Sequence, residues 1–155
     1  MSLFELSIAK TLIHEGGYVN NVNDPGGETN RGISKRDHPL EDIKNMTVER
    51  ATEIYREGYW KDLWSQIESQ LVCDKLFDCG VLFGVHTSVR ILQLTLNTTQ
   101  DGLFGLNTLA AVNQAEEISL LKGYKTNLVT HTFNIATANP KLRIFLKGWA
   151  TRINS

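Results

Sequence analysis

The stretch Leu71-Val-Cys-Asp-Lys-Leu-Phe-Asp-Cys-Gly-Val-Leu-Phe83 is the most apolar segment of the chain. It shows no alternation of period two, so it is predicted to be a helix buried at the centre of the fold. Cys73 and Cys79 would lie on different faces of this helix, with Cα atoms roughly 10 Å apart and beyond the reach of a disulfide. We therefore expect two free, buried thiols and a chain made in a reducing compartment.

Helices are predicted on both sides of this segment as well. The first opens at Ser2, which forms a capping-box pattern with Glu5, and ends at Gly16-Gly17. The polar stretch 18–36 has too little apolar content to pack by itself and is predicted to be loop, turn or a short irregular sheet. The remaining predicted helices are 47–59 with Thr47 as N-cap, 88–96, a short helix capped by Asn107 or Thr108 and running to Val112, 119–138, and Pro140–Ile153.

Length and composition fit one compact domain. The 155 residues are too few for two domains of ordinary size, and a hydrophobic content of 41% allows a sizeable core. We find no linker, repeat, signal peptide or membrane span. Residues 1–155 are therefore predicted to form a single, mainly α-helical domain, with a polar loop or short irregular sheet after the first helix, and a monomer is the default expectation.

The net charge is close to zero, but the charges are unevenly spread. Sixteen Lys and Arg face seventeen Asp and Glu, which argues against a protein that binds nucleic acid through a large positive field. Residues 118–155 carry no acidic side chain and six basic ones, namely Lys122, Lys125, Lys141, Arg143, Lys147 and Arg152. This basic end is expected to be either a solvated helical surface or a contact for an anionic polymer.

The residues most suited to catalysis lie in and after His14-Glu15-Gly16-Gly17-Tyr18. Glu15 falls at the end of the first helix, where the macrodipole disfavours an ionised carboxylate, so it is a candidate general acid. Asp24 and Thr29 could face it across a cleft if the loop folds back, and Glu28 is a rival for the role of Asp24. An acid opposed by a carboxylate and a hydroxyl suits glycoside hydrolysis. The plain alternative is a solvated glutamate followed by an Asp-Pro-Gly-Gly turn.

Other side chains of the same loop are candidates for substrate binding. Tyr18, Glu28, Asn30 and Arg31 offer aromatic, carboxylate, amide and guanidinium groups suited to the N-acetyl, hydroxyl and carboxylate groups of a saccharide. Asparagines in such a loop equally often stabilise turns. No cofactor or metal is expected, because no second histidine follows His14 at the spacing of a zinc protease.

Three stretches closely resemble the N-terminal signature of glycoside hydrolase family 108: His14–Asn20, Asn23–Asn30 and Gly32-Ile33. Members of this family are peptidoglycan-degrading N-acetylmuramidases of phage endolysins and prophage-like regions. The resemblance continues in parts of 51–60, 77–83, 92–109 and 145–152, so it covers nearly the whole chain. The sequence departs from the family at Arg31, where an aromatic residue is more usual, and at Cys79 and Leu82-Phe83.

The resemblance implies a lysozyme-like fold, with Glu15 as the catalytic acid that cleaves the β-1,4 bond between N-acetylmuramic acid and N-acetylglucosamine in bacterial peptidoglycan. It also implies a phage endolysin that accumulates in the host cytoplasm, reaches the wall through holin-made lesions and causes host lysis. No separate wall-binding module fits in the chain. The stretch 101–109 looks like a turn of peptidoglycan-binding modules, although a helix-joining turn is the favoured interpretation. The basic end could contact anionic envelope polymers.

Two other functions fit the same residues. A lytic transglycosylase cleaves the same bond without adding water and needs only one acid. A wall-binding or structural phage protein without catalysis would also keep the polar loop.

Overall fold

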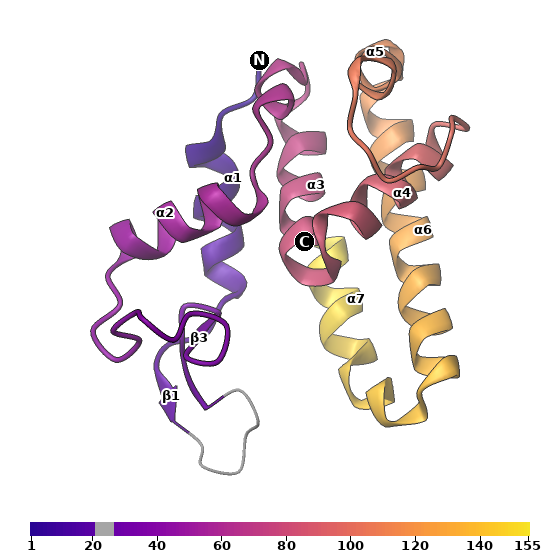
Figure 1. Cartoon of the computed structure of the whole chain (residues 1–155). Helices are drawn as coiled ribbons and strands as arrows, with labels where there is room; N and C mark the ends of the chain where they lie inside the picture. Colours follow the sequence, from indigo (N-terminus) through magenta and orange to yellow (C-terminus); the bar gives the residue numbers. More distant parts are fainter. Residues whose placement is uncertain (21–26) are drawn as a thin grey trace.

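The computed structural model describes residues 1–20 and 27–155, and its centre is the predicted buried helix (Figure 1). Helix α3 (Gln70–Phe83) is buried from Val72 to Gly80 without interruption, as expected for a helix surrounded by others. Helix α1 (Phe4–His14) packs along one side of it and α4 (Val85–Thr95) along the other. Cys73 and Cys79 are free and buried as predicted, and burial raises the pKa of both thiols to about 12.

On the α1 side, α2 (Val48–Tyr59) and a short 3-10 helix, η1 (Asp62–Gln66), complete an aromatic core. Thr47 caps α2 as predicted, since its hydroxyl accepts the N–H of Arg50. The expected role of Ser2 as N-cap of α1 is wrong. Leu3 occupies that position without a side-chain cap, and the buried Ser2 hydroxyl instead donates to the carbonyl of Ile67 at 2.8 Å.

On the other side, α5 (Leu106–Gln114), α6 (Glu117–Ala138), η2 (Pro140–Phe145) and α7 (Leu146–Asn154) follow α4. The predicted caps of α5 are wrong, because Gly105 is its N-cap and no side chain caps it. The last predicted helix is divided in two. Asn139 caps a 3-10 turn over the first six residues, and an α-helix takes over only at Leu146.

The polar stretch after α1 forms a small antiparallel sheet, which confirms the predicted short irregular sheet. Strands β1 (Val19–Asn20), β2 (Glu28–Asn30) and β3 (Ile33–Ser34) pair in sequence order. Arg31 and Gly32 join β2 to β3 with φ angles of 51° and 77°, so both residues of this two-residue turn are left-handed. Such turns match the twist of the flanking strands.

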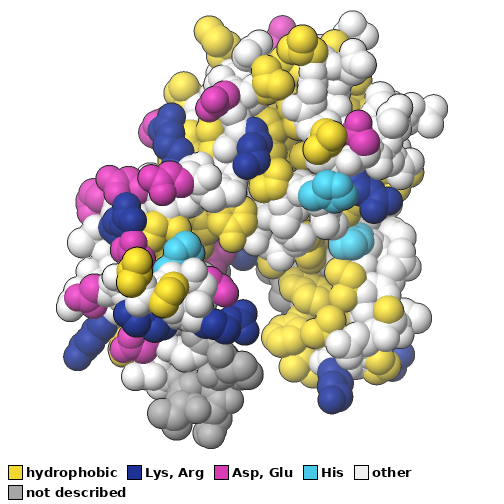
Figure 2. All heavy atoms as spheres, viewed as in Figure 1, with side chains coloured by type: hydrophobic (Ala, Val, Ile, Leu, Met, Phe, Trp, Pro, Cys, Tyr) yellow, Lys and Arg dark blue, Asp and Glu magenta, His cyan; other side chains and the backbone are white. Residues whose placement is uncertain are grey.

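The sheet and the α6–α7 end lie on opposite sides of a hollow, at the end of the molecule where α1 finishes (Figures 1 and 2). Charged side chains gather on the sheet side of this hollow, and hydrophobic side chains gather over α7 (Figure 2). None of the helices in the described ranges is long and apolar enough to cross a bilayer. The fold therefore brings the polar segment after α1 opposite the last helix of the chain.

Candidate active site

Glu15 follows the last residue of α1, and its side chain lies between α7 and the turn that joins β2 to β3. Its backbone, just past the last helical position, is extended (φ −86°, ψ 132°) and ends the helix. Its side chain is only 15% exposed. A largely buried carboxylate needs partners, and each of its two oxygens meets a different part of the fold.

The first oxygen of Glu15 is paired with Arg152 of α7. Nη2 of Arg152 lies 2.8 Å from Oε1 of Glu15 and 3.0 Å from Oδ1 of Asp78 in α3. Nε of Arg152 also donates to that Asp78 oxygen at 3.1 Å. Burial alone would lower the pKa of Arg152, but the two carboxylates outweigh it and raise the pKa above its ordinary value. Arg152 therefore connects the first and last helices through a charge held between two acids.

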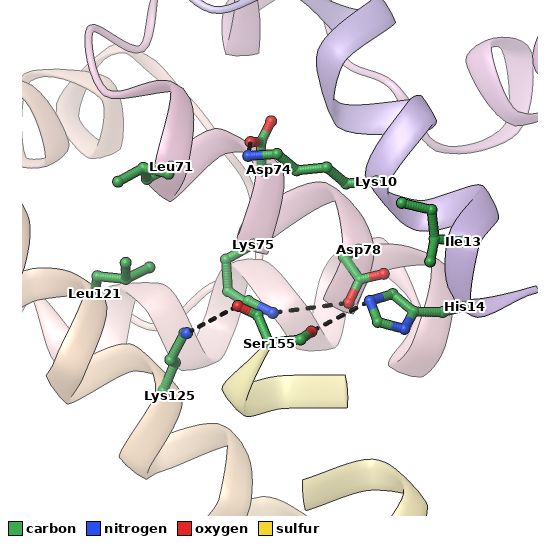
Figure 3. A pocket seen from close by; sticks show the side chains of 10 residues that line it. All are labelled: Lys10, Ile13, His14, Leu71, Asp74, Lys75, Asp78, Leu121, Lys125 and Ser155. Atoms are coloured by element: carbon green, nitrogen blue, oxygen red, sulfur yellow. Dashed lines mark hydrogen bonds and ion pairs between the residues drawn. The ribbon is translucent and has the colours of Figure 1, made fainter. Parts of the chain in front are cut away.

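The second carboxylate, Asp78, is supported from behind by Lys75 (Figure 3). Nζ of Lys75 lies 4.0 Å from Oδ2 of Asp78 and donates to the carbonyl of Arg152 at 3.0 Å. Burial lowers the pKa of Lys75. Figure 3 shows both side chains at the edge of a cavity of about 290 Å³, where His14 and Ser155 also meet. Sequence reasoning did not find Asp78 or Arg152, although an aspartate inside the most apolar segment was the available signal.

The second oxygen of Glu15 faces Gly32 and the hydroxyl of Tyr55. A Cβ atom on Gly32 would overlap both groups, so the approach of the β2–β3 turn depends on glycine. The Tyr55 hydroxyl donates to the carbonyl of Arg31 at 2.9 Å, and the Arg31 N–H donates to the carbonyl of Gly16 at 3.0 Å. Burial and then the charge of Glu15 raise the pKa of Tyr55 well above its ordinary value. The turn is thus fixed against Glu15 from both sides.

The other predicted catalytic residues belong to this sheet. Thr29 is the middle residue of β2, opposite Val19 and Ser34. Glu28 accepts a hydrogen bond from the Tyr18 hydroxyl at 2.8 Å, and this bond raises the pKa of Tyr18. Asp24 lies outside the described residues. Glu28 and Thr29 are therefore carried by the same small sheet whose turn touches Glu15.

Two of the predicted substrate-binding residues also make hydrogen bonds within the fold. Asn30 is 8% exposed, and its amide donates to the carbonyls of Ile43 at 3.0 Å and Lys44 at 3.4 Å. Nε of Arg31 donates to the carbonyl of Met46 at 3.4 Å. Both side chains therefore hold the segment after β3 against the sheet, and their predicted contact with substrate stays a prediction.

Two protein-family models match the chain, one in each half. Residues 8–84 match a family model described as glycosyl hydrolase 108, and residues 87–154 match one described as a predicted peptidoglycan domain. The chain belongs to the glycosyl hydrolase 108 family. It is a glycoside hydrolase of the muramidase type, and peptidoglycan is its partner.

A solved structure, that of Brucella abortus SagA, is similar to this glycosyl hydrolase 108 chain along nearly its whole length. The TM-score is 0.78 at 28% sequence identity, over 97% of this chain and 89% of that chain. Curated proteins give no match. The lysozyme-like, mainly helical fold expected from the sequence is confirmed.

The boundary between the two matched segments of this family member falls between α3 and α4. Glu15 and Asp78 lie in the first segment and Arg152 in the second. The ion pairs around Arg152 therefore cross the boundary, and the peptidoglycan segment completes the surroundings of Glu15.

Proposed function

We propose that this enzyme hydrolyses the β-1,4 bond between N-acetylmuramic acid and N-acetylglucosamine, with Glu15 as the general acid. The observation that carries the proposal is the position of the Glu15 carboxylate, held between the guanidinium of Arg152 and the glycine of the β2–β3 turn. His14, the chain neighbour of Glu15, and Arg152, its ion-pair partner, both line an open groove along α7. A carboxyl group held between the sheet and α7 can meet a glycosidic oxygen in the space between these two elements.

Arg152 supports the proton transfer by stabilising its product. When Glu15 gives its proton to the leaving oxygen, a carboxylate remains, and the neighbouring guanidinium lowers the energy of that negative charge. Because Asp78 holds the guanidinium and Lys75 holds the backbone carbonyl of the same residue, little reorganisation is needed as the charge develops. Glu15 at the end of α1 is thus held by Arg152 of α7, which is in turn held by Asp78 and Lys75 of α3.

In this proposal the opposite face of the sugar is served by the loop and sheet that follow Glu15. Asp24 and Thr29 activate or position the water, and Glu28 is the rival carboxylate for that role. Tyr18, which is 40% exposed and bonded to Glu28, offers its ring and hydroxyl to the substrate.

The test is turnover of purified peptidoglycan by a Glu15→Gln variant. We expect release of reducing sugar ends to fall by a factor of about 1,000 or more, because an amide cannot donate the required proton. Glu57→Gln, an exposed position of α2, is the matched control and should keep wild-type turnover. Equal clearing by Glu15→Gln and the control would remove Glu15 from the mechanism, whereas a wild type that binds peptidoglycan but releases no sugar ends would be a wall-binding protein without catalysis.

Mass spectrometry of the products separates hydrolysis from the transglycosylase alternative. Hydrolysis adds water and leaves reducing N-acetylmuramic acid ends, whereas 1,6-anhydro ends throughout would identify a lytic transglycosylase. Among Asp24→Asn, Glu28→Gln and Thr29→Ala, the residue that positions the water should give the largest loss of kcat, about 100-fold, with a smaller change in KM.

We further propose that the enzyme is a phage endolysin that stays in the host cytoplasm until holin lesions release it. Two free, buried thiols are consistent with synthesis in a reducing compartment. Expression in a bacterial cytoplasm should cause lysis only when a lesion-forming holin is co-expressed. Lysis without the holin would contradict this route.

The basic end extends the proposal to anionic envelope polymers. Lys122, Lys141, Arg143 and Lys147 are exposed, whereas Arg152 is committed to the site. A Lys122/Lys141/Arg143→Gln variant should lose about half of its lytic activity at low salt and little at high salt, because salt screens such contacts. The control Lys44/Lys61/Arg90→Gln removes equal charge elsewhere on the surface, and identical salt curves for both variants would favour a merely solvated surface.

A further inference from the structure

A groove of about 610 Å³ begins beside Glu15 and runs along α7. Its inner end is formed by His14 and Arg152, the chain neighbour and the ion-pair partner of Glu15. From there it continues past Thr151, Gly148 and Lys147 to η2, with Leu82 of α3 also lining it. It contains none of the residues of the sheet that were predicted from the sequence to bind substrate.

The lining of this groove is apolar and aromatic. Phe145 and Trp149 lie with ring centroids 5.8 Å apart and planes 32° from parallel, and Phe83 packs edge-on against Trp149 at 6.0 Å. Phe145 is 49% exposed and Ile144 is 78% exposed. Figure 2 shows hydrophobic side chains gathered over α7 beside the hollow. Exposed aromatic rings gathered in one concave place are typical of a ligand site.

We infer that this groove, called here the α7 groove, binds a sugar ring of the glycan strand next to the bond that Glu15 cleaves. The inference rests on the proposed function and adds a binding subsite to it. His14 and Arg152 line the groove and adjoin Glu15, so a strand bound at Glu15 can extend into it. The apolar C–H face of a pyranose packs on aromatic rings and is removed from water there. Lys147 at the groove adds a cation suited to the lactyl or peptide carboxylates of the muramic acid units.

Gly148 gives a direct way to fill the groove without disturbing the fold. It lies in α7 and lines the groove, and a Cβ atom added there would meet no other atom within 4 Å. Leucine is also a better helix former than glycine, so Gly148→Leu should fold at least as well as the parent. Gly58 is the matched control, because it is also helical and exposed and also has nothing within 4 Å of an added Cβ.

Binding can be measured by tryptophan fluorescence in a Glu15→Gln background, with peptide-free glycan strands of alternating N-acetylglucosamine and N-acetylmuramic acid as the probe. Of the three tryptophans, Trp60 and Trp64 are buried in the core, so a change on binding reports Trp149. We expect a saturable change that disappears with Trp149→Phe. Gly148→Leu should weaken binding about tenfold, and Gly58→Leu should leave it unchanged. Phe145→Ser, which removes an exposed ring, should weaken binding to a similar extent.

The same groove substitutions, made singly in the active enzyme, separate the groove inference from the proposed hydrolase function. If Glu15→Gln is inactive but Gly148→Leu and Phe145→Ser keep the wild-type KM on peptidoglycan, the groove inference is wrong and the proposed function stands. If the wild type releases no sugar ends, the proposed function fails, and the fluorescence titration still decides whether the groove binds glycan. Equal affinities of the Gly148→Leu and Gly58→Leu proteins would overturn the inference.

Discussion

Glu15 and Asp101 are both carboxylates beside a glycine of positive φ, namely Gly32 (77°) and Gly102 (72°). Asp101 is satisfied by its own neighbourhood. Its Oδ1 accepts the N–H of Leu103 at 2.9 Å and the amide of Gln93 at 2.8 Å. Glu15 is instead paired with Arg152, which comes from the last helix. A motif whose polar groups are satisfied locally builds a turn, whereas one that depends on distant partners can build a site.

The stretch 101–109, which lies inside the segment matched by the peptidoglycan family model, forms the turn between α4 and α5 and the start of α5. Gln93 is 1% exposed and bonds to Asp101, to the Leu103 carbonyl, to the Thr108 hydroxyl and to the Gly102 N–H. The helix-joining turn, which the sequence favoured over a peptidoglycan-binding motif, is the arrangement that the bonds support.

Among the variants that test this comparison, the largest effect is expected from Arg152→Met. It leaves the buried carboxylate of Glu15 without its cation and leaves Asp78 with only the more distant Lys75, so the free energy of unfolding should fall by about 3 kcal/mol or more. Hydrolysis should fall about 100-fold or more for the same reason. Urea unfolding and turnover of peptidoglycan measure both effects. The control Arg90→Met, an exposed residue of α4, should change neither, and a wild-type response from Arg152→Met would contradict the tertiary role given to this ion pair.

A pair of glycine variants tests the two turns directly. Gly32→Ala would bring a methyl group against Glu15 and Tyr55, and Gly102→Ala would bring one against the ring of His86. Both should lower the free energy of unfolding by about 1–3 kcal/mol, because both positions have positive φ. At a temperature where both proteins are folded, only Gly32→Ala should lose most of its activity. Equal activities would mean that the turn at Gly32 is not part of the site.

The smallest effect concerns pH. Hydrogen bonds from the Leu103 N–H and from Gln93 hold the pKa of Asp101 below its usual value of 3.8. A lowered pKa in the folded state contributes stability that is present above 3.8 and is lost as the pH falls through the lowered value. Asp101→Asn should therefore be less stable than the wild type at pH 7, and thermal unfolding should show this difference shrinking below pH 4. Parallel stability curves at every pH would exclude this contribution.

Much of the fold followed from local chemistry. The apolar run at 71–83 could only be satisfied at the centre of a helical bundle, and Thr47 had the side chain and position of an N-cap. A predicted local hydrogen bond failed where the same side chain bonds to a distant segment instead. The Ser2 hydroxyl donates to Ile67, from a distant segment, instead of capping α1.

The sequence by itself determined the helices, the polar turn region and Glu15 as the candidate acid, because each depends on spacing along a few residues. Only the tertiary structure decided what surrounds Glu15. Arg152 was one of six basic residues near the end of the chain, and Asp78 was one polar residue in an apolar helix. Their pairing needs α1, α3 and α7 to converge, and no local pattern encodes the partner of a buried charge. The α7 groove likewise exists only because the last helix is folded back beside the first.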